Sequence, residues 1–389
     1  MPALSASARL ARCHNIADLR ALARRRLPDP IFQFLDGGAE DETTLRRNSA
    51  AFETLALIPR GLVDVSAVTT TTRVLGQQLD WPVFCGPTGT SRFFHPEGEL
   101  AVARAAAKAG TLYGLSIAAT QRLEEVAAVS DGAKMFQLYI FKDRSVTHEL
   151  VRRCRQSGYG ALCLTIDTAV VGKRERDLRS GWGIPINLSA KSMLSFACHP
   201  VWLLGLLGGG PLSIATIAEI SGNTGIADQM RYIGAQLDPG VTWKDVRAII
   251  DLWGGPFAIK GVMAADDARA AVDAGASAII VSNHGGRQLD GAAAAIEALP
   301  DIVAAVGDRA EIILDGGIRR GSHVLKALAL GARACSIGRP YLYGLAAGGE
   351  KGVGKALDIL RAEFVRALQL CGCAAIDHID RTILHKAQP

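Results

Sequence analysis

From about residue 81 onward, short apolar runs alternate with longer amphipathic stretches, which is the pattern of repeated strand–helix units. In four of these units the helical stretch ends at a glycine, a residue suited to a left-handed helix cap, and an apolar strand follows. Stretches such as 99–108 and 264–273 are alanine-rich and amphipathic, as helices on the outside of a barrel must be. The predicted strands cover residues 81–86, 112–116, 134–139, 161–165, 256–261, 278–282, 311–316 and 334–338.

Eight such units close a (β/α)8 barrel, so the pattern predicts an α/β fold of the TIM-barrel type. The spacing alone leaves a doubly wound open sheet as the alternative topology. In a barrel the active site stands at the carboxyl ends of the strands. Polar, glycine or proline residues occupy that end of the predicted strands, namely Pro87, Thr88, Gly89, Ser116, Gln137, Tyr139, Thr165, Asp167, Lys260, His284, Arg287, Asp315, Gly316, Gly317, Gly338 and Arg339.

The segment 282–290, Ser-Asn-His-Gly-Gly-Arg-Gln-Leu-Asp, follows a buried-strand pattern and places a base and an anion-binding cation three residues apart. In isolation, a histidine and an arginine at this spacing would more often be solvated loop residues, but the barrel pattern favours a functional site. Glycine-rich turns at 315–319 and 337–339 follow the seventh and eighth strands, where barrels commonly bind phosphate. Together these turns predict a cofactor that carries a phosphate.

Composition narrows the class of protein. The 389 residues are 49% apolar, enough to bury a large core, and the eight cysteines are scattered as in a reduced, intracellular protein. Six arginines lie within the first 26 residues without an apolar run behind them, so we expect no secretory signal peptide. The net charge of +5 is spread along the chain, which predicts no nucleic-acid partner. The histidines show no metal-ligand spacing, and no metal is expected.

Taken together, the motifs resemble those of the FMN-dependent α-hydroxy-acid oxidases and dehydrogenases. The resemblance implies a barrel rather than an open sheet, within one domain over residues 1–389. It implies a helical N-terminal segment over 1–80, the barrel over 81–389 and a loop insertion at 180–225 after the fourth strand. The matching motifs lie at 27–28, 36–41, 86–89, 137–139, 165–167, 282–290 and 338–340.

The same resemblance implies how FMN is held. Lys260 resembles the cation beside N1 and O2 of the flavin, where negative charge accumulates on reduction. The stretch Pro87, Thr88 and Gly89 resembles the backbone that approaches N5. The remaining implied cofactor contacts are Ser116, Gln137 and Thr165 at the ring, with Ser282 and Asp315, and a phosphate cradle of Gly316, Gly317, Arg319, Gly338 and Arg339.

For catalysis, the resemblance implies that His284 removes a proton from an (S)-2-hydroxy acid while two electrons pass to the flavin; the carbanion and hydride routes both stay open. Asp167 resembles the carboxylate that orients the imidazole, and Arg287 the guanidinium that grips the substrate carboxylate. Tyr139 resembles the hydroxyl that supports the substrate oxygen. Arg174 is a candidate second cation, although the run 173–177 equally suits a solvated surface. The retained base argues against a flavin barrel acting on a nucleotide or prenyl phosphate, and against a non-catalytic flavin protein.

Two positions depart from the family pattern. Phe34 stands where the family usually has a tyrosine that bonds the substrate carboxylate, and the missing hydroxyl weakens that binding by about 0.5–3 kcal/mol. Ala118 stands where plant glycolate oxidases carry a bulky tryptophan, which leaves space. Both departures predict a 2-hydroxy acid larger and more apolar than lactate.

The segment 192–220 carries no formal charge before Glu219, yet two prolines and three consecutive glycines argue against a spanning helix. It predicts either an interfacial membrane contact or packing against the barrel or a subunit neighbour. With 189–191 it resembles the loop of bacterial membrane-associated mandelate and lactate dehydrogenases, and Gly89 resembles that branch too. The resemblance therefore favours a quinone as electron acceptor, with a soluble oxidase that reduces O2 to hydrogen peroxide as the alternative. It implies a homotetramer in the cytoplasm or on the inner face of the cell membrane.

Overall fold

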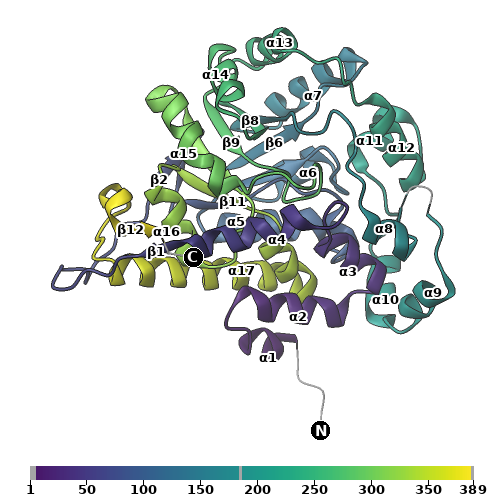
Figure 1. The fold of residues 1–389 in the computed structure, drawn as a ribbon. Helices are drawn as coiled ribbons and strands as arrows, with labels where there is room; N and C mark the ends of the chain where they lie inside the picture. Colours follow the sequence, from purple (N-terminus) through teal and green to yellow (C-terminus); the bar gives the residue numbers. More distant parts are fainter. Residues whose placement is uncertain (1–5, 184–185, 387–389) are drawn as a thin grey trace.

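The computed structural model describes residues 6–183 and 186–386, and its centre is a closed parallel barrel (Figure 1). Each strand pairs with its sequence neighbours, and the last pairs with the first. The eight predicted strands are confirmed within two residues at either end, which excludes the open sheet. They are β4 (Val83–Cys85), β5 (Tyr113–Ser116), β6 (Lys134–Leu138), β7 (Ala161–Thr165), β8 (Phe257–Val262), β9 (Ala278–Val281), β10 (Glu311–Asp315) and β11 (Ala334–Ile337).

Amphipathic helices surround the barrel, because the strands bury side chains on both faces and need an apolar cover outside. The predicted stretches 99–108 and 264–273 are helical as α5 (Gly98–Lys108) and α14 (Ala265–Asp273). The other outer helices are α6 (Leu123–Ala128), α7 (Arg144–Gln156), α13 (Trp243–Trp253), α15 (Ala295–Val306), α16 (Gly321–Ala329) and α17 (Arg339–Leu370), which is broken at Gly348 and Gly349.

An apolar plug closes the amino-terminal end of the barrel. The antiparallel hairpin of β2 (Thr72–Val74) and β3 (Gln77–Leu79) places Val74, Leu75 and Leu79 against buried side chains from the barrel interior. The backbone N–H of Leu75 also donates to Glu311 on β10 at 2.8 Å. The open end of the barrel is therefore the carboxyl end, as expected for this fold.

The N-terminal segment is helical over a shorter range than expected. Helices α1 (Ala6–Ala11), α2 (Ile16–Arg26), α3 (Asp29–Asp36) and α4 (Thr43–Ala50) lead into the 3-10 turn η1 (Ala51–Thr54). Beyond it, β1 (Leu55–Leu57) pairs with β12 (Leu384–Lys386), and the β2–β3 hairpin follows. The expectation of helix up to residue 80 is therefore wrong beyond residue 54. The physical reason is that 69–74 is rich in β-branched threonines and that Leu75 and Gly76 adopt the positive φ of a tight hairpin turn.

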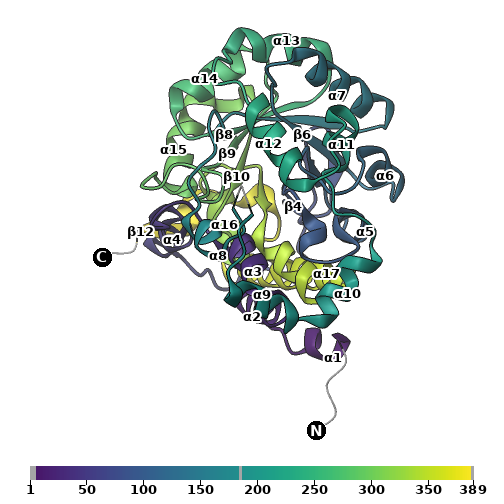
Figure 2. The same cartoon turned by 90° about the vertical axis from the view of Figure 1, so that its right-hand side faces the viewer.

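The insertion after β7 forms short helices along one side of the barrel mouth (Figure 2). Within the described ranges, no single helix is long and apolar enough to cross a membrane; α9 and α10, which meet at 80°, pass that test only as a bent pair. Residues 184 and 185 of the predicted insertion lie outside the described residues. The helices are α8 (Glu175–Ser180), α9 (Ala190–Ala197), α10 (Pro200–Gly208), α11 (Ala215–Ser221) and α12 (Ile226–Gln236).

The pair α9–α10 has two faces. On one, Trp202 donates its indole N–H to the carbonyl of Phe93 at 2.7 Å, and Phe196 packs against Trp182 and Trp202. The other face is exposed and apolar, with side chains that are 55–73% exposed at Met193, Leu194, Val201, Leu204 and Leu207. Thus, among the described residues, only the face with Phe196 and Trp202 packs against the rest of the chain, and the face with the five exposed apolar side chains does not.

Asp36 joins the N-terminal segment to the barrel. Its carboxylate accepts two hydrogen bonds from Arg20 on α2, at 2.6 and 2.7 Å, and one from the Tyr343 hydroxyl on α17 at 2.8 Å. Arg176 on α8 lies 3.2 Å away. Burial works to raise the pKa of Asp36, but Arg20 and Tyr343 outweigh it and lower the pKa to about 2.

We predict that Asp36→Asn lowers the free energy of unfolding by roughly 2 kcal/mol at neutral pH. Because the folded-state pKa is depressed, the stabilisation is present above the unfolded pKa of about 3.9 and is lost as the pH falls towards about 2. Urea unfolding at several pH values should show the gap between wild type and variant closing below about pH 4. Asp41→Asn, at an exposed carboxylate, is the control; a gap that does not change with pH would contradict the assignment.

Candidate active site

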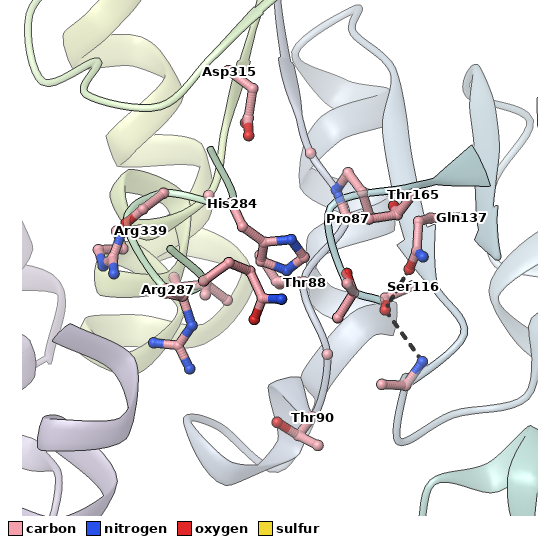
Figure 3. Close-up of a pocket in the computed structure, with 18 of the residues that line it drawn as sticks. Pro87, Thr88, Thr90, Ser116, Gln137, Thr165, His284, Arg287, Asp315 and Arg339 are labelled. Atoms are coloured by element: carbon pink, nitrogen blue, oxygen red, sulfur yellow. Dashed lines mark hydrogen bonds between the residues drawn. The ribbon is translucent and has the colours of Figure 1, made fainter. Parts of the chain in front are cut away.

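A cavity of about 320 Å³ opens at the carboxyl end of the barrel. Figure 3 shows His284, Arg287 and Arg339 on one side of it and Ser116, Gln137 and Thr165 on the other. All predicted site residues line this cavity except Asp167 and Ser282, which lie just behind its wall. Those that line it are Phe34, Pro87, Thr88, Gly89, Ser116, Ala118, Gln137, Tyr139, Thr165, Arg174, Lys260, His284, Arg287, Asp315, Gly316, Gly317, Arg319, Gly338 and Arg339.

His284 and Asp167 form a hydrogen-bonded pair. His284 Nδ1 lies 2.8 Å from Asp167 Oδ1, and the Thr168 hydroxyl donates to the same oxygen at 3.1 Å. Burial works to raise the pKa of Asp167, but the charge and hydrogen bond of His284, and then Lys260, lower it overall. Asp167 is therefore a carboxylate at neutral pH and accepts the hydrogen bond from Nδ1–H; in the neutral imidazole this tautomer leaves the lone pair on Nε2.

Three neighbouring strands hold a buried ammonium at the cavity wall. Lys260 on β8 donates to Ser282 Oγ at 2.9 Å and lies 3.2 Å from Asp315 on β10. Ser282, just after β9, donates to the same Asp315 oxygen at 2.6 Å. Burial works to lower the pKa of Lys260, but the charge of Asp315 raises it overall. Lys260 is thus a fixed positive charge facing the cavity.

A cluster of arginines also lines the cavity. Arg287 donates to the carbonyls of Phe34 and Gly37 at 2.9 and 3.0 Å, and Arg339 donates to those of Gly285 and Gly37 at 2.9 and 2.7 Å. Burial, and then the charges of Arg174 and Arg339, lower the pKa of Arg287. Among the described residues, the buried Nε of Arg339 has no hydrogen-bond partner. Buried cations with free donors are a binding site for anions.

Backbone approaches the cavity closely at its glycines. A Cβ on Gly89 would lie 2.8 Å from Cβ of Ala118, and one on Gly317 would lie 1.9 Å from the carbonyl of Asn48. Gly317 also has a φ of +75°, which disfavours other residues.

On the polar wall, Ser116 donates to Gln137 at 3.0 Å and accepts from the Ala118 amide at 3.2 Å (Figure 3).

The remaining wall is apolar, and sequence reasoning missed most of it. Phe34 and Ala118 were predicted; the insertion adds four aliphatic residues around helices α11 and α12. These residues carry no chemical signature and lie between the motifs at 165–167 and 282–290, about 45 positions from either one, so only the spacing of apolar positions in 214–237 could have suggested them. They are Ile214, Met230, Ile233 and Leu237.

Two cations lie close to the ring of Phe34, which lines the cavity. The guanidinium carbons of Arg287 and Arg174 are 5.2 and 5.7 Å from its ring centroid, within cation–π range. Arg174 is also paired with Asp177 at 3.0 Å. Of the run 173–177, Lys173 is an exposed residue paired with Glu175, whereas Arg174 lines the cavity.

Other members of segment 282–290 attach the N-terminal segment to this mouth. Asn283 and Asn48 on α4 exchange two side-chain hydrogen bonds, at 2.8 and 2.7 Å. Asp290 accepts from the backbone amides of Thr43 and Thr44 at the start of α4, at 3.2 and 2.7 Å. Sequence reasoning did not assign these roles, because both partners lie more than two hundred positions away in the chain.

The donor set has a definite chemical character. The cavity offers a buried ammonium and an arginine cluster with a free donor, and glycines bring backbone close to it. This arrangement fits a flat, phosphate-bearing cofactor with an electron-rich edge. Among the described residues, no group of three or more histidine, cysteine or acidic side chains could hold a metal ion.

Comparison with known proteins agrees with this chemistry. The model of the FMN-dependent dehydrogenase family matches residues 23–386. The chain is 45% identical over 375 residues to an L-lactate oxidase of Nostoc sp. (95% of this chain, 98% of that protein) and 42% identical to an L-lactate dehydrogenase of Caulobacter sp. (96% and 98%). A crystal structure of a monotopic membrane protein, (S)-mandelate dehydrogenase, superposes with a TM-score of 0.93 at 39% identity (97% and 100%).

The chain belongs to the FMN-dependent dehydrogenase family. It is an oxidoreductase of the 2-hydroxy-acid oxidase and dehydrogenase type, which uses FMN and acts on CH–OH donors.

Proposed function

We propose that this enzyme oxidises an (S)-2-hydroxy acid with a bulky apolar side chain to the 2-oxo acid, and that a quinone takes up the electrons. The observation that carries the proposal is one cavity lined by His284, which is hydrogen-bonded to Asp167, by Arg287 and by an apolar wall. A base, a carboxylate clamp and space for a side chain are the three elements that such a substrate requires.

Several cavity residues suit the cofactor. Lys260, kept charged by Asp315, would stand beside the edge of the flavin that becomes negative, and Arg319 and Arg339 would hold the phosphate with the amides of Gly316, Gly317 and Gly338. The close backbone at Pro87–Gly89 and the side chains of Ser116, Gln137, Thr165 and Ser282 complete this set. When bound, FMN supplies a two-electron acceptor.

The remaining steps belong to side chains of the chain. Arg287 binds the substrate carboxylate through its planar fork, with Arg174 as a second cation at the mouth. Tyr139 holds the substrate hydroxyl; burial and the Asp167 charge raise the pKa of this phenol, so it remains a donor. His284 Nε2 takes up the substrate proton, and Asp167 stabilises the imidazolium that forms. The substrate gives one proton to His284, and its second proton and two electrons would go to the two-electron acceptor that bound FMN supplies, which yields the 2-oxo acid.

The apolar wall supports a bulky substrate. Ala118 takes little space, and Ile214, Met230, Ile233 and Leu237 offer aliphatic contacts. Burying one phenyl or long alkyl group against such a wall contributes about 1.5–3 kcal/mol, comparable to the hydrogen bond lost with a phenylalanine at position 34.

The exposed face of α9–α10 supports a membrane contact and therefore a lipid-soluble acceptor. Five large apolar side chains share this face, and the similar (S)-mandelate dehydrogenase is a monotopic membrane protein. The second candidate is an oxidase that passes electrons to O2, because the chain is 45% identical to an L-lactate oxidase.

The proposal predicts which acid reduces the bound flavin. In anaerobic mixing, (S)-mandelate or a long-chain 2-hydroxy acid should bleach the flavin faster than (S)-lactate or glycolate, because only the larger acids fill the apolar wall. Admission of a quinone should then restore the oxidised spectrum quickly, and air only slowly. Rapid recovery in air would identify the oxidase; absence of bleaching by all four acids would refute the assignment as a 2-hydroxy-acid enzyme.

Introducing a hydroxyl at position 34 should reduce the preference for large over small 2-hydroxy acids. Phe34→Tyr is expected to lower the dissociation constant of (S)-lactate by about 2- to 10-fold, because a phenol can bond the carboxylate, with a smaller gain for (S)-mandelate. Phe34→Leu, which removes the ring that faces Arg287 and Arg174, should weaken both acids. Binding can be followed by flavin reduction against acid concentration. Equal gains for the two acids would mean that position 34 does not set substrate size.

The membrane contact predicts binding to lipid vesicles that survives high salt, because apolar insertion is not screened as charge attraction is. The double substitution Leu204→Glu with Leu207→Glu should reduce cosedimentation with phosphatidylcholine vesicles by at least about tenfold. Leu370→Glu is the matched control, since that side chain is 63% exposed but lies at the end of α17. Wild-type protein that stays in the supernatant at low and high salt would contradict the contact.

A further inference from the structure

Gln288 stands four residues after His284 and has no role in the function proposed above. Its side chain joins two loops: Nε2 donates to the carbonyls of Asp167 and Val170 at 2.9 and 2.8 Å, and Oε1 accepts from the Gly172 amide at 3.0 Å. The Gln288 amide therefore makes three hydrogen bonds, and all three go to one neighbouring segment, 167–172.

The two loops joined in this way carry the two members of the partly buried His284–Asp167 pair. Segment 167–172 follows β7 and contains Asp167; the loop after β9 contains His284 and Gln288. The loops also pack backbone to backbone, since a Cβ on Gly172 would lie 2.4 Å from the carbonyl of Arg287. The amide of Gln288 thus fixes the position of the Asp167 loop relative to the His284 loop.

Apolar burial does not hold segment 167–172 in place. Its side chains Val170 and Val171 are 72% and 58% exposed, so they contribute little packing against the barrel. The segment does have the Asp167–His284 bond and the Thr168 bond to the same carboxylate. The polar contacts of Gln288 are therefore a principal restraint on the position of the Asp167 backbone.

We propose that Gln288 is a positioning residue for the base: it holds segment 167–172 so that the Asp167 carboxylate stays 2.8 Å from His284 Nδ1. This rests on the proposed role of His284, whereas the restraint on the segment is independent of that role. Loosening the segment lets the carboxylate drift from the imidazole, and displacements of about 1 Å at such pairs can cost up to a hundredfold in rate.

The test compares two replacements of similar size. Gln288→Met removes all three hydrogen bonds; Gln288→Glu keeps an acceptor for Gly172 but turns a carboxylate towards two carbonyls. At about pH 8 both should slow anaerobic flavin reduction by saturating (S)-mandelate by at least about tenfold, with the dissociation constant of the acid changed less than about twofold. FMN content should equal that of wild type. Gln369→Glu is the control, because Gln369 bonds the Val65 carbonyl at the surface, far from the cavity.

A pH series separates positioning from simple loss of structure. Below the pKa of the introduced glutamate its carboxyl group becomes a donor again, so the rate of Gln288→Glu relative to wild type should rise as the pH falls towards about 5, while that of Gln288→Met should not. The wild type and each variant share the nearby titratable and charged groups Asp167, His284, Arg287 and Arg174. The ratio of their rates therefore reports only the effect of the substitution at position 288. Rates within twofold of wild type, or a loss that follows FMN content and ignores pH, would overturn the proposal.

Hydrogen exchange tests the restraint without catalysis. Amides of 168–174 should exchange at least about tenfold faster in Gln288→Met than in wild type or in Gln369→Glu, because the Gly172 acceptor and two anchors are lost. If wild type is reduced by no 2-hydroxy acid, the proposed function fails and this measurement alone decides the restraint. Unchanged exchange in Gln288→Met overturns it.

Discussion

Closure of eight parallel strands forces every carboxyl end to one mouth, and the candidate site depends on this constraint. Lys260, Ser282 and Asp315 come from three successive strands or their ends, and they meet only because those strands are neighbours in the barrel. The plug made by the β2–β3 hairpin closes the opposite end, so the polar mouth is the place where a cofactor can enter.

Within that mouth, the charge of each buried cation depends on its burial and on the groups to which it is hydrogen-bonded. Asp315 keeps the buried ammonium of Lys260 charged, whereas the arginines donate to neutral carbonyls. A cation paired with a carboxylate has part of its charge compensated, whereas one held by carbonyls retains its full attraction for an incoming anion. The cavity thus holds a carboxylate-paired charge at Lys260 and carbonyl-held charges at Arg287 and Arg339, which are the proposed anion-binding groups, and Asp167 is hydrogen-bonded to the proposed base, His284.

Segments outside the barrel complete the site. The N-terminal segment brings the Phe34 ring and the carbonyls that hold Arg287, and it is fastened by Asp36 and by the Asn48–Asn283 pair. The insertion after β7 brings the apolar wall and, on its outer side, the exposed face of α9–α10. Because α12 contributes to the substrate cavity while α9 and α10 of the same insertion face outwards, one insertion serves both the proposed substrate preference and the proposed choice of acceptor.

The sequence by itself determined the strand positions and most of the polar site, since strand ends in a parallel barrel are marked by local signals: an apolar run, then glycine or a polar residue. It also marked Phe34 and Ala118 as departures from a family pattern. Only the tertiary structure decided how far the N-terminal helices extend, that Asp167 and Ser282 stand behind the cavity wall, and that Ile214, Met230, Ile233 and Leu237 line it. Gln288 likewise acquires its partners only in three dimensions, more than a hundred positions away. The physical reason is that apolar side chains and amides can pair with many different partners. The packing of segments far apart in the sequence decides which partners they contact, so no local sequence pattern predicts these contacts.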